Sequence, residues 1–130
     1  MDIIERFIDR AKSRNLRLVL PEGNDERIIL AARRLNDDGI ANAIVLGQPD
    51  ELKAVAARAD VSLEGLTTSA PEESDKLDVY AEMYASARPS ANIKVARRMM
   101  RKPLFYGGMM VKAGDAHAMI AGVASTTSRV

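Results

Sequence analysis

Hydrophobic positions along the chain follow two different patterns. Stretches such as the one that holds Ile28, Ile29 and Ala32 have the three- and four-residue spacing of an amphipathic helix. Others, such as residues 43–46, are short uninterrupted apolar runs, which are typical of strands buried on both faces of a sheet. Together the patterns predict helices over residues 3–11, 25–38, 52–59, 73–87, 92–101 and 103–112, and strands over 16–20, 43–46, 63–69 and 116–121.

The predicted strands and helices alternate along most of the chain. This order is typical of an α/β fold, in which a mostly parallel sheet lies between two helical layers as a three-layer α/β/α arrangement. The sequence contains no internal repeat or interdomain linker, so we expect residues 1–130 to form a single α/β domain. The loops after Leu20, Leu46 and Ala121 are expected at the carboxyl end of the sheet, where ligands of such folds bind.

Composition narrows the classes of function. Apolar residues make up 47% of the chain and charged residues 28%, and the formal net charge of +1 gives no steer toward nucleic acid or membrane. The absence of cysteine excludes disulfides, thiolate zinc sites and a thiol nucleophile, and a single histidine leaves little for a metal site. No apolar run approaches membrane-spanning length, and the start of the chain is acidic and amphipathic rather than signal-like. We therefore expect a cytoplasmic protein without nucleic-acid or membrane partners.

The last stretch of the chain carries the strongest candidate chemistry. The apolar run 116–121 ends at Gly122, and Ser125, Thr126, Thr127, Ser128 and Arg129 follow within seven positions. A buried strand that leads into a hydroxyl-rich turn is how α/β proteins build a phosphate or oxyanion site, and the alternative is a polar tail. Because the chain stops one residue past the arginine, we expect it to be a fragment of a longer protein.

Two further charged groups have plainer interpretations. Residues 21–27 (Pro-Glu-Gly-Asn-Asp-Glu-Arg) place three acids and an arginine at a strand-to-helix turn, which is typical of a capped helix start. One glycine is too few for a nucleotide-binding fingerprint. The basic cluster consists of Arg97, Arg98, Arg101 and Lys102. It lacks the aromatic interleaving of a nucleic-acid site, so we expect a solvated helix face.

Two single residues have a structural and a functional interpretation. Arg88 follows the long helix, where a surface arginine at a helix C-terminus is the simpler interpretation. His117 lies within the predicted strand 116–121. We expect a buried histidine that is satisfied by one hydrogen bond, the alternative being a catalytic role.

Several of these segments together resemble a known family. The residues are Val19-Leu20-Pro21-Glu22-Gly23 with Arg27 shortly after, Asp38-Gly39-Ile40, Ile44-Val45-Leu46-Gly47, and Gly114-Asp115-Ala116-His117-Ala118-Met119-Ile120-Ala121-Gly122. Their order and spacing are similar to the amino-terminal part of phosphate acetyltransferases (phosphotransacetylases). The resemblance implies a two-domain α/β/α enzyme related in fold to isocitrate and isopropylmalate dehydrogenases. Such an enzyme transfers an acetyl group reversibly between coenzyme A and orthophosphate.

The resemblance also implies roles for individual residues. Arg88, which follows Tyr84 in the family's Tyr-x-x-x-Arg spacing, is expected to contact coenzyme A. Ser125, Thr126 and Thr127 match the family's hydroxyl-rich loop, and Arg129 matches the arginine after it. His117 stands where the family usually has an aspartate, and the 125–129 loop is shorter and lacks an acid. The loop departure resembles butyryl or ethanolamine-pathway relatives, and it leaves the acyl chain open.

The resulting hypothesis is the amino-terminal domain of a phosphate acyltransferase that works as a homo-oligomer when complete. Coenzyme A would be a substrate, with acetyl phosphate and phosphate as the other small molecules and no prosthetic group or metal. The family's catalytic serine, arginine and aspartate would lie beyond Val130, so the fragment alone should be inactive. A second hypothesis is a stand-alone, non-catalytic module that binds a phosphate-bearing ligand, coenzyme A or a partner. A third hypothesis is a receiver-like domain, but the chain lacks the aspartate that such a domain requires after a later strand.

Overall fold

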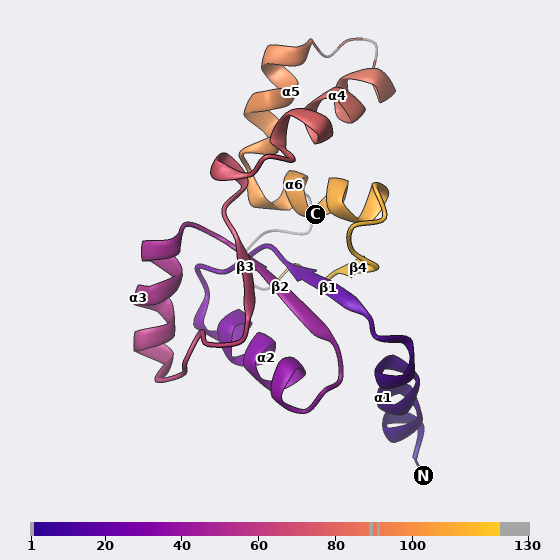
Figure 1. Ribbon diagram of the computed structural model, residues 1–130, viewed down its shortest axis with the longest axis vertical. Helices are drawn as coiled ribbons and strands as arrows, with labels where there is room; N and C mark the ends of the chain where they lie inside the picture. Colours follow the sequence, from indigo (N-terminus) through magenta and orange to yellow (C-terminus); the bar gives the residue numbers. More distant parts are fainter. Residues whose placement is uncertain (1, 89, 91, 123–130) are drawn as a thin grey trace.

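The computed structural model describes residues 2–88, 90 and 92–122 (Figure 1). The helices in that part of the chain are α1 (Ile3–Arg14), α2 (Glu26–Asp37), α3 (Pro49–Ala59), the 3-10 helix η1 (Pro71–Glu73), α4 (Leu77–Ala87), α5 (Ile93–Met100) and α6 (Pro103–Lys112). The strands are β1 (Arg17–Leu20), β2 (Asn42–Leu46), β3 (Thr67–Ser69) and β4 (Ala118–Met119). The predicted alternation of strands and helices is confirmed.

The four strands form one parallel sheet in the order β3-β2-β1-β4. β1 lies in the middle, with Leu20 opposite Val45 on one side and Leu18 opposite Ala118 on the other. The chain therefore moves outward from β1 to β3 and then returns to the other side of β1 for β4. The carboxyl ends of β1 and β4 meet where the direction of strand addition reverses.

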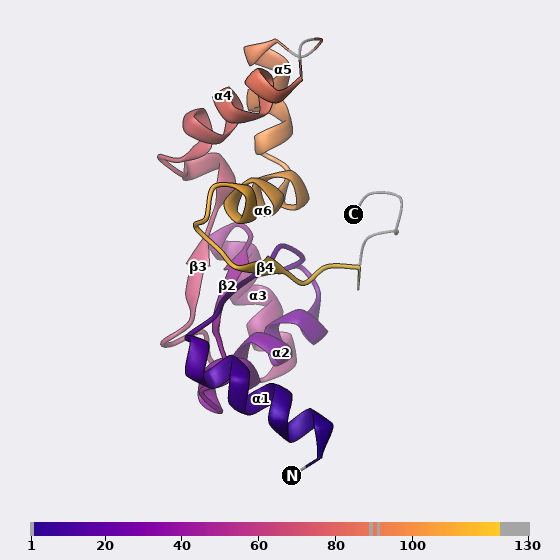
Figure 2. The ribbon, with the colours of Figure 1, turned by 90° about the vertical axis from the view of Figure 1, so that its right-hand side faces the viewer.

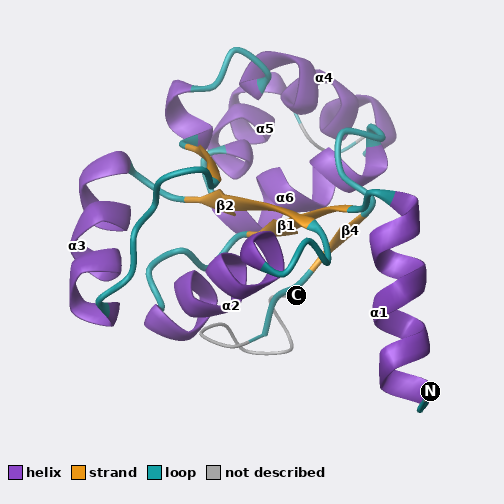
Figure 3. Ribbon diagram, turned by 60° about the horizontal axis from the view of Figure 1, so that its bottom comes forward, coloured by secondary structure: helices purple, strands orange, loops and turns teal. Residues whose placement is uncertain are grey.

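Side chains of β1 and β2 alternate between two hydrophobic cores. Val19, Ile44 and Leu46 pack with residues of α4, α5 and α6 on one face of the sheet. Leu20 and Val45 pack with residues of α2 and α3 on the opposite face. Figure 3 shows these two helical groups on either side of the strands, so the predicted three-layer α/β/α class is confirmed. Because both faces are covered, the strands carry no polar alternation.

The first helix lies apart from the two helical layers. Asp2 caps α1 by accepting a hydrogen bond from the backbone N–H of Glu5, and Asn15 ends it in the left-handed conformation. Ala11 is buried, whereas Ile3 and Ile4 are 82% and 67% exposed. Figure 2 shows α1 extending away from the sheet toward the N-terminus.

The long helix predicted over residues 73–87 is interrupted. Pro71–Glu73 form a 3-10 turn, Ser74 is extended, and α4 begins only at Leu77. The Ser74 hydroxyl accepts a hydrogen bond from the Lys76 N–H and lies 2.5 Å from the Tyr106 hydroxyl. A serine that bonds to nearby backbone and side-chain groups competes with helix formation, which explains the break.

The prediction of a buried terminal strand over 116–121 was wrong in extent and in burial. The strand covers only Ala118–Met119 and pairs with β1 alone at the edge of the described sheet. His117 is exposed rather than buried, and its Nδ1 accepts a hydrogen bond from the Arg17 N–H at 2.9 Å. Ile120 is 41% exposed. An edge strand keeps one side open, so a buried environment does not follow from an apolar run.

Tyr80 joins α4 to the connection between α6 and β4. Its side chain is 2% exposed, its hydroxyl donates a hydrogen bond to the Asp115 carboxylate, and its ring meets that of Tyr106 edge-to-face at 5.0 Å. Burial raises the pKa of Tyr80 above its usual value, and the hydrogen bond to Asp115 raises it further. The neutral phenol is therefore the form that the folded chain requires.

Replacing Tyr80 by phenylalanine should change how unfolding depends on pH. A pKa raised in the folded state contributes stability that is present below pH ~10 and is lost as the pH rises further. At pH 7 we expect Tyr80→Phe to lower the free energy of unfolding by about 1–3 kcal/mol, because the Asp115 carboxylate loses its donor. Urea unfolding at pH 8 and pH 10.5 should show a smaller alkaline loss in Tyr80→Phe than in the unaltered chain. Equal alkaline losses in both chains would contradict the assignment.

Candidate functional site

A pocket of about 280 Å³ opens between α4, α6 and β4 on the side of the sheet that carries the predicted site residue Arg88. Its lining consists of Tyr84, Ala87, Arg88, Leu104, Phe105, Gly108, Met109, Lys112 and Met119. Most of these side chains are apolar, and the charged ones are cations. The pocket therefore suits a ligand that has an apolar body and an anionic group.

Arg88 is held at this pocket by the ring of Tyr84. Arg88 is the C-cap residue of α4, and its Cζ lies 4.6 Å from the centroid of the Tyr84 ring, one helical turn earlier. Stacking on an aromatic ring orients a guanidinium and leaves the N–H groups at its edge available to an anion. Within the described residues no carboxylate lies within ion-pair distance of Arg88.

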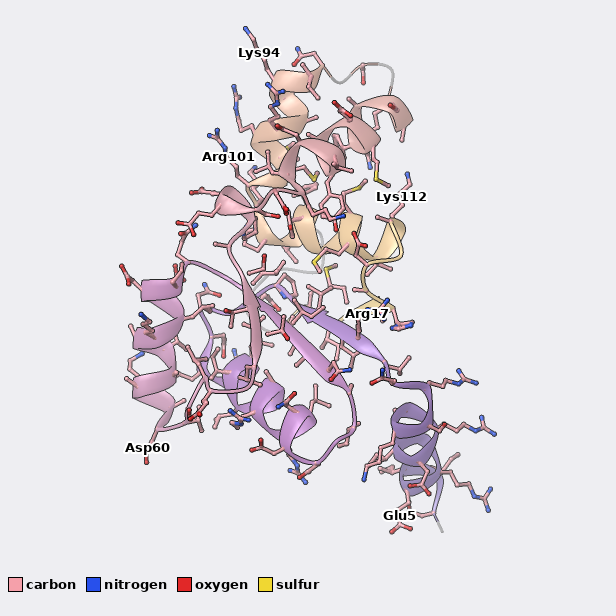
Figure 4. All side chains as sticks on the ribbon, in the orientation of Figure 1. Glu5, Arg17, Asp60, Lys94, Arg101 and Lys112 are labelled. Carbon is pink, nitrogen blue, oxygen red and sulfur yellow. The ribbon has the colours of Figure 1, made fainter. Side chains whose placement is uncertain are left out.

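Lys112 adds a second cation to the same pocket. It lies in the last turn of α6 and, like Arg88, has no ion pair with another described residue. Lys112 also lines a neighbouring open hollow of about 540 Å³ beside Glu82 and Ser86. Figure 4 shows its ammonium end projecting from the end of α6. Two uncompensated cations from different helices attract phosphate-type groups.

Two adjacent glycines lie in α6, and one of them, Gly108, lines the pocket. A Cβ at Gly107 would lie 3.0 Å from the Met119 sulfur and 3.5 Å from Cγ2 of Val19, so this glycine lets the helix lie close to β1 and β4. A Cβ at Gly108 would meet no atom within 4 Å, which leaves space in the pocket. Glycine inside a helix costs about 1 kcal/mol relative to alanine, so this pair was the sequence signal that could have indicated the pocket.

The turn after β1 lies at the carboxyl end of the sheet. A Cβ at Gly23 would come within 2.5 Å of both the Leu46 carbonyl oxygen and Cδ2 of Leu52, so only glycine fits there. The preceding Glu22 is 4% exposed and accepts a hydrogen bond from the backbone N–H of Gly122 at 2.9 Å. No local sequence pattern indicates this partner of Glu22, because Gly122 lies 100 residues later in the chain.

The predicted capped helix start at this turn is confirmed. Asp25 is the N-cap of α2, and its Oδ1 accepts hydrogen bonds from the backbone N–H and from Nε of Arg27. The pair also forms an ion pair at 2.7 Å. These bonds to Arg27 hold the pKa of Asp25 below its usual value, with the side-chain bond as the largest cause.

Of the predicted site residues, the structure describes only Arg88. Arg88 lines the pocket, whereas Ser125, Thr126, Thr127 and Arg129 lie outside the described residues. Met119 of β4 belongs to the pocket wall and precedes them in the chain. The basic cluster is exposed on and after α5, as expected for a solvated face, and Arg97 pairs with Asp78 at 3.0 Å.

The residues that the structure describes contain no group of three or more histidine, aspartate or glutamate side chains placed to hold a metal ion. None of their helices has the length and apolar character needed to cross a membrane.

Comparisons with known proteins agree with each other on one family. The family model described as phosphate acetyl/butaryl transferase matches residues 2–130. The phosphate acetyltransferase of Acetivibrio thermocellus is 39% identical over 130 residues, a match that covers 98% of this chain and 39% of that protein. The phosphate acetyltransferase of Corynebacterium glutamicum is 35% identical over 124 residues, and the match covers 38% of that protein. The chain thus spans about two fifths of the length of these relatives.

Solved structures show the same relation in the fold. A phosphotransacetylase from Streptococcus pyogenes superposes with a TM-score of 0.91 at 29% identity, over 99% of this chain and 40% of that one. The EutD phosphotransacetylase from Staphylococcus aureus gives a TM-score of 0.89 at 25% identity, over 95% of this chain and 38% of that one. The predicted likeness to isocitrate and isopropylmalate dehydrogenases stays a prediction.

Gly23→Ala should destabilise the chain, whereas Gly108→Ala should not. A Cβ at Gly23 has to displace the backbone of β2, and overpacking of this kind costs about 1–3 kcal/mol. A Cβ at Gly108 meets open space and improves helix propensity, which should add about 0.5–1 kcal/mol. Urea unfolding of both variants at pH 7 would check the difference in sign. A stable Gly23→Ala chain would contradict the close packing of this turn.

Lys112→Met should weaken the binding of inorganic pyrophosphate to the pocket. A charged hydrogen bond contributes about 1.5–3 kcal/mol, so we expect a loss of at least about tenfold in affinity, measured by isothermal titration calorimetry. Lys94→Met is the matched control, because Lys94 is an exposed lysine on α5 outside the pocket (Figure 4). Equal losses in the two variants would show that the effect is one of net charge and not of the pocket.

Proposed function

The chain belongs to the phosphate acetyl/butaryl transferase family, and on this premise we propose that it is part of a phosphate acyltransferase. The reaction is the reversible transfer of an acetyl or short acyl group between coenzyme A and orthophosphate, with acetyl phosphate as the second acyl carrier. Within this reaction we assign the pocket of Arg88 and Lys112 to the binding of coenzyme A.

The observation that carries this proposal is the orientation of Arg88. Its guanidinium stacks on Tyr84 at the edge of a mostly apolar pocket and has no carboxylate partner among the described residues. Coenzyme A combines phosphate groups with a long, largely apolar arm. The cations match the phosphates, and Phe105 and Met109 offer apolar contacts to the arm.

The pocket supports binding and orientation rather than proton transfer. In the forward reaction the coenzyme A sulfur attacks the acyl carbon of acetyl phosphate, the carbon–oxygen bond to phosphate breaks, and the thiol proton passes to a base. Lys112 and Arg88 carry positive charge, and the described lining of the pocket includes no carboxylate that could accept this proton. The contribution of these residues is to fix one substrate relative to the other, which lowers the entropic part of the barrier.

We extend the proposal to the residues that lie outside the described part of the chain. Ser125, Thr126 and Thr127 would donate hydroxyl hydrogen bonds, and Arg129 a guanidinium, to a phosphate oxygen of a substrate. What supports this is their place in the sequence, a few residues after Met119, which lines the pocket. Fixed donors aimed at developing negative charge are the strongest form of transition-state stabilisation.

Family membership is also the basis on which we propose the cofactor use, partners, location and assembly of the complete enzyme. Coenzyme A acts as a substrate, and no prosthetic group or metal takes part. The partners are small molecules rather than nucleic acid or membrane, and the complete enzyme acts in the cytoplasm as a homo-oligomer.

A second candidate function is a non-catalytic module that binds coenzyme A or another phosphate-bearing ligand. The observation that favours it is the same cationic lining without a carboxylate base among the described residues of the pocket. Both candidates require the pocket to bind phosphate. They differ in whether an acyl group is transferred. Because the fragment alone should be inactive, what separates them is whether the native reading frame continues past Val130 and, if it does, whether the whole protein forms acetyl phosphate from acetyl-coenzyme A and phosphate.

Arg88→Ala should weaken coenzyme A binding to this chain. Loss of a charged hydrogen bond of about 1.5–3 kcal/mol corresponds to roughly a tenfold to hundredfold change in the dissociation constant. Calorimetric titration would compare Arg88→Ala and Arg129→Ala with Arg101→Ala, an exposed arginine after α5 that does not line the pocket. Losses in the first two variants and none in Arg101→Ala are expected. No binding by the unaltered chain at millimolar coenzyme A would contradict the proposed role of the pocket.

A further inference from the structure

Glu22 is the one charged residue recorded as buried in the part of the chain that the structure describes, with 4% of its surface exposed. It follows Pro21 directly after β1. Its Oε1 accepts a hydrogen bond from the backbone N–H of Gly122 at 2.9 Å, and Gly122 lies just beyond β4. The bond therefore joins the carboxyl ends of two neighbouring strands by a side chain.

The bond lies at the point of the fold where ligands of such sheets bind. In the order β3-β2-β1-β4, strand addition reverses between β1 and β4, and ligand sites lie outside the carboxyl ends of strands at such a reversal. The backbone hydrogen bonds between the two strands extend as far as the bond that the Ile120 N–H donates to the Val19 carbonyl, at 2.9 Å. Two residues after Ile120, the backbone N–H of Gly122 donates its hydrogen bond to the Glu22 carboxylate.

Both partners of this bond are fixed by their own backbones. Gly23 presses the turn against the carbonyl of Leu46, and the Glu22 carbonyl accepts a hydrogen bond from the Asp25 N–H at 3.1 Å. Gly122 has a φ of +101°, a conformation that residues with a side chain rarely adopt. The carboxylate thus holds the chain at a glycine where its direction changes.

The bond between Glu22 and Gly122 joins a backbone N–H to a buried carboxyl group. A buried carboxylate is costly unless hydrogen bonds compensate it, and a bond from N–H to a carboxylate is about twice as strong as a neutral one. Glu22 also helps, after Asp25, to raise the pKa of Arg27. The carboxyl group of Glu22 is therefore buried beside Gly122 at the carboxyl end of the sheet.

We propose that Glu22 is a positioning residue, whose carboxylate fixes Gly122 at the carboxyl end of the sheet, three residues before Ser125 in the sequence. Glu22 need not touch a substrate for this role. The proposal rests on the proposed function for one point, that residues 125–129 bind an anionic group of the substrate.

Amide NMR spectra of the labelled chain test the positioning directly. Glu22→Ala should speed hydrogen exchange of the Gly122 amide by about tenfold or more and should shift the amide signals of residues 123–130. Glu26→Ala is the matched control, an exposed glutamate four residues later on α2 that should leave these signals unchanged. Unchanged Gly122 exchange in Glu22→Ala would overturn the proposal.

A conservative variant keeps the test decisive if Glu22→Ala does not fold. Glu22→Gln retains the side-chain volume and an acceptor oxygen but removes the charge. The Gly122 amide proton should then move to lower chemical shift, because a neutral acceptor forms a weaker bond. An unchanged Gly122 signal in Glu22→Gln would overturn the proposal.

Coenzyme A binding separates this proposal from the proposed function. Measured by calorimetry, Glu22→Ala should raise the dissociation constant about tenfold, Glu22→Gln about threefold or less, and Glu26→Ala not at all. Equal affinity in Glu22→Ala and Glu26→Ala would overturn the positioning role. No binding by the unaltered chain would contradict the proposed function alone, and the Gly122 exchange would still decide the role of Glu22.

Discussion

The close packing of the turn after β1 is the constraint on which the carboxyl end of the sheet depends. Gly23 lies so near the Leu46 carbonyl and the Leu52 side chain that no Cβ fits between them. This contact fixes where α2 begins, and with it the ion pair of Asp25 with Arg27. It also aims Glu22 at Gly122. The absence of a side chain at Gly23 thus lets the turn after β1 lie directly against the end of β2.

On the other face of the sheet, the pocket depends on how α4 and α6 are held together. Tyr80 bonds to Asp115 and meets Tyr106 edge-to-face, so α4 is tied both to α6 and to the connection that leads into β4. These contacts place Arg88, at the end of α4, opposite Lys112 in the last turn of α6. The pocket and the bond between Glu22 and Gly122 depend on different contacts. Both involve β4 or the residues just after it, since Met119 lines the pocket and Gly122 bonds to Glu22.

The family relation extends this local chemistry to an enzyme. The match to the phosphate acetyl/butaryl transferase model spans residues 2–130, and the superposed phosphotransacetylase structures share the fold at TM-scores of 0.89 and 0.91. The chain covers about two fifths of those proteins. A largely apolar pocket whose two cations have no ion pair with another described residue suits a phosphate-bearing ligand with an apolar arm.

By itself, the sequence determined what depends on near neighbours in the chain. The apolar runs and helical spacings predicted the parallel three-layer fold, and Asp25 was identified as a helix cap, because these signals act over a few residues. Arg88 was predicted to contact coenzyme A from its spacing to Tyr84 together with the family resemblance, and the structure places it in the lining of the pocket. Only the tertiary structure decided the rest: the break at Ser74, the exposure of His117, the pocket cation Lys112 and the bond from Glu22 to Gly122. Each depends on a group far away in sequence or on which strand lies at the sheet edge, and local patterns do not record either.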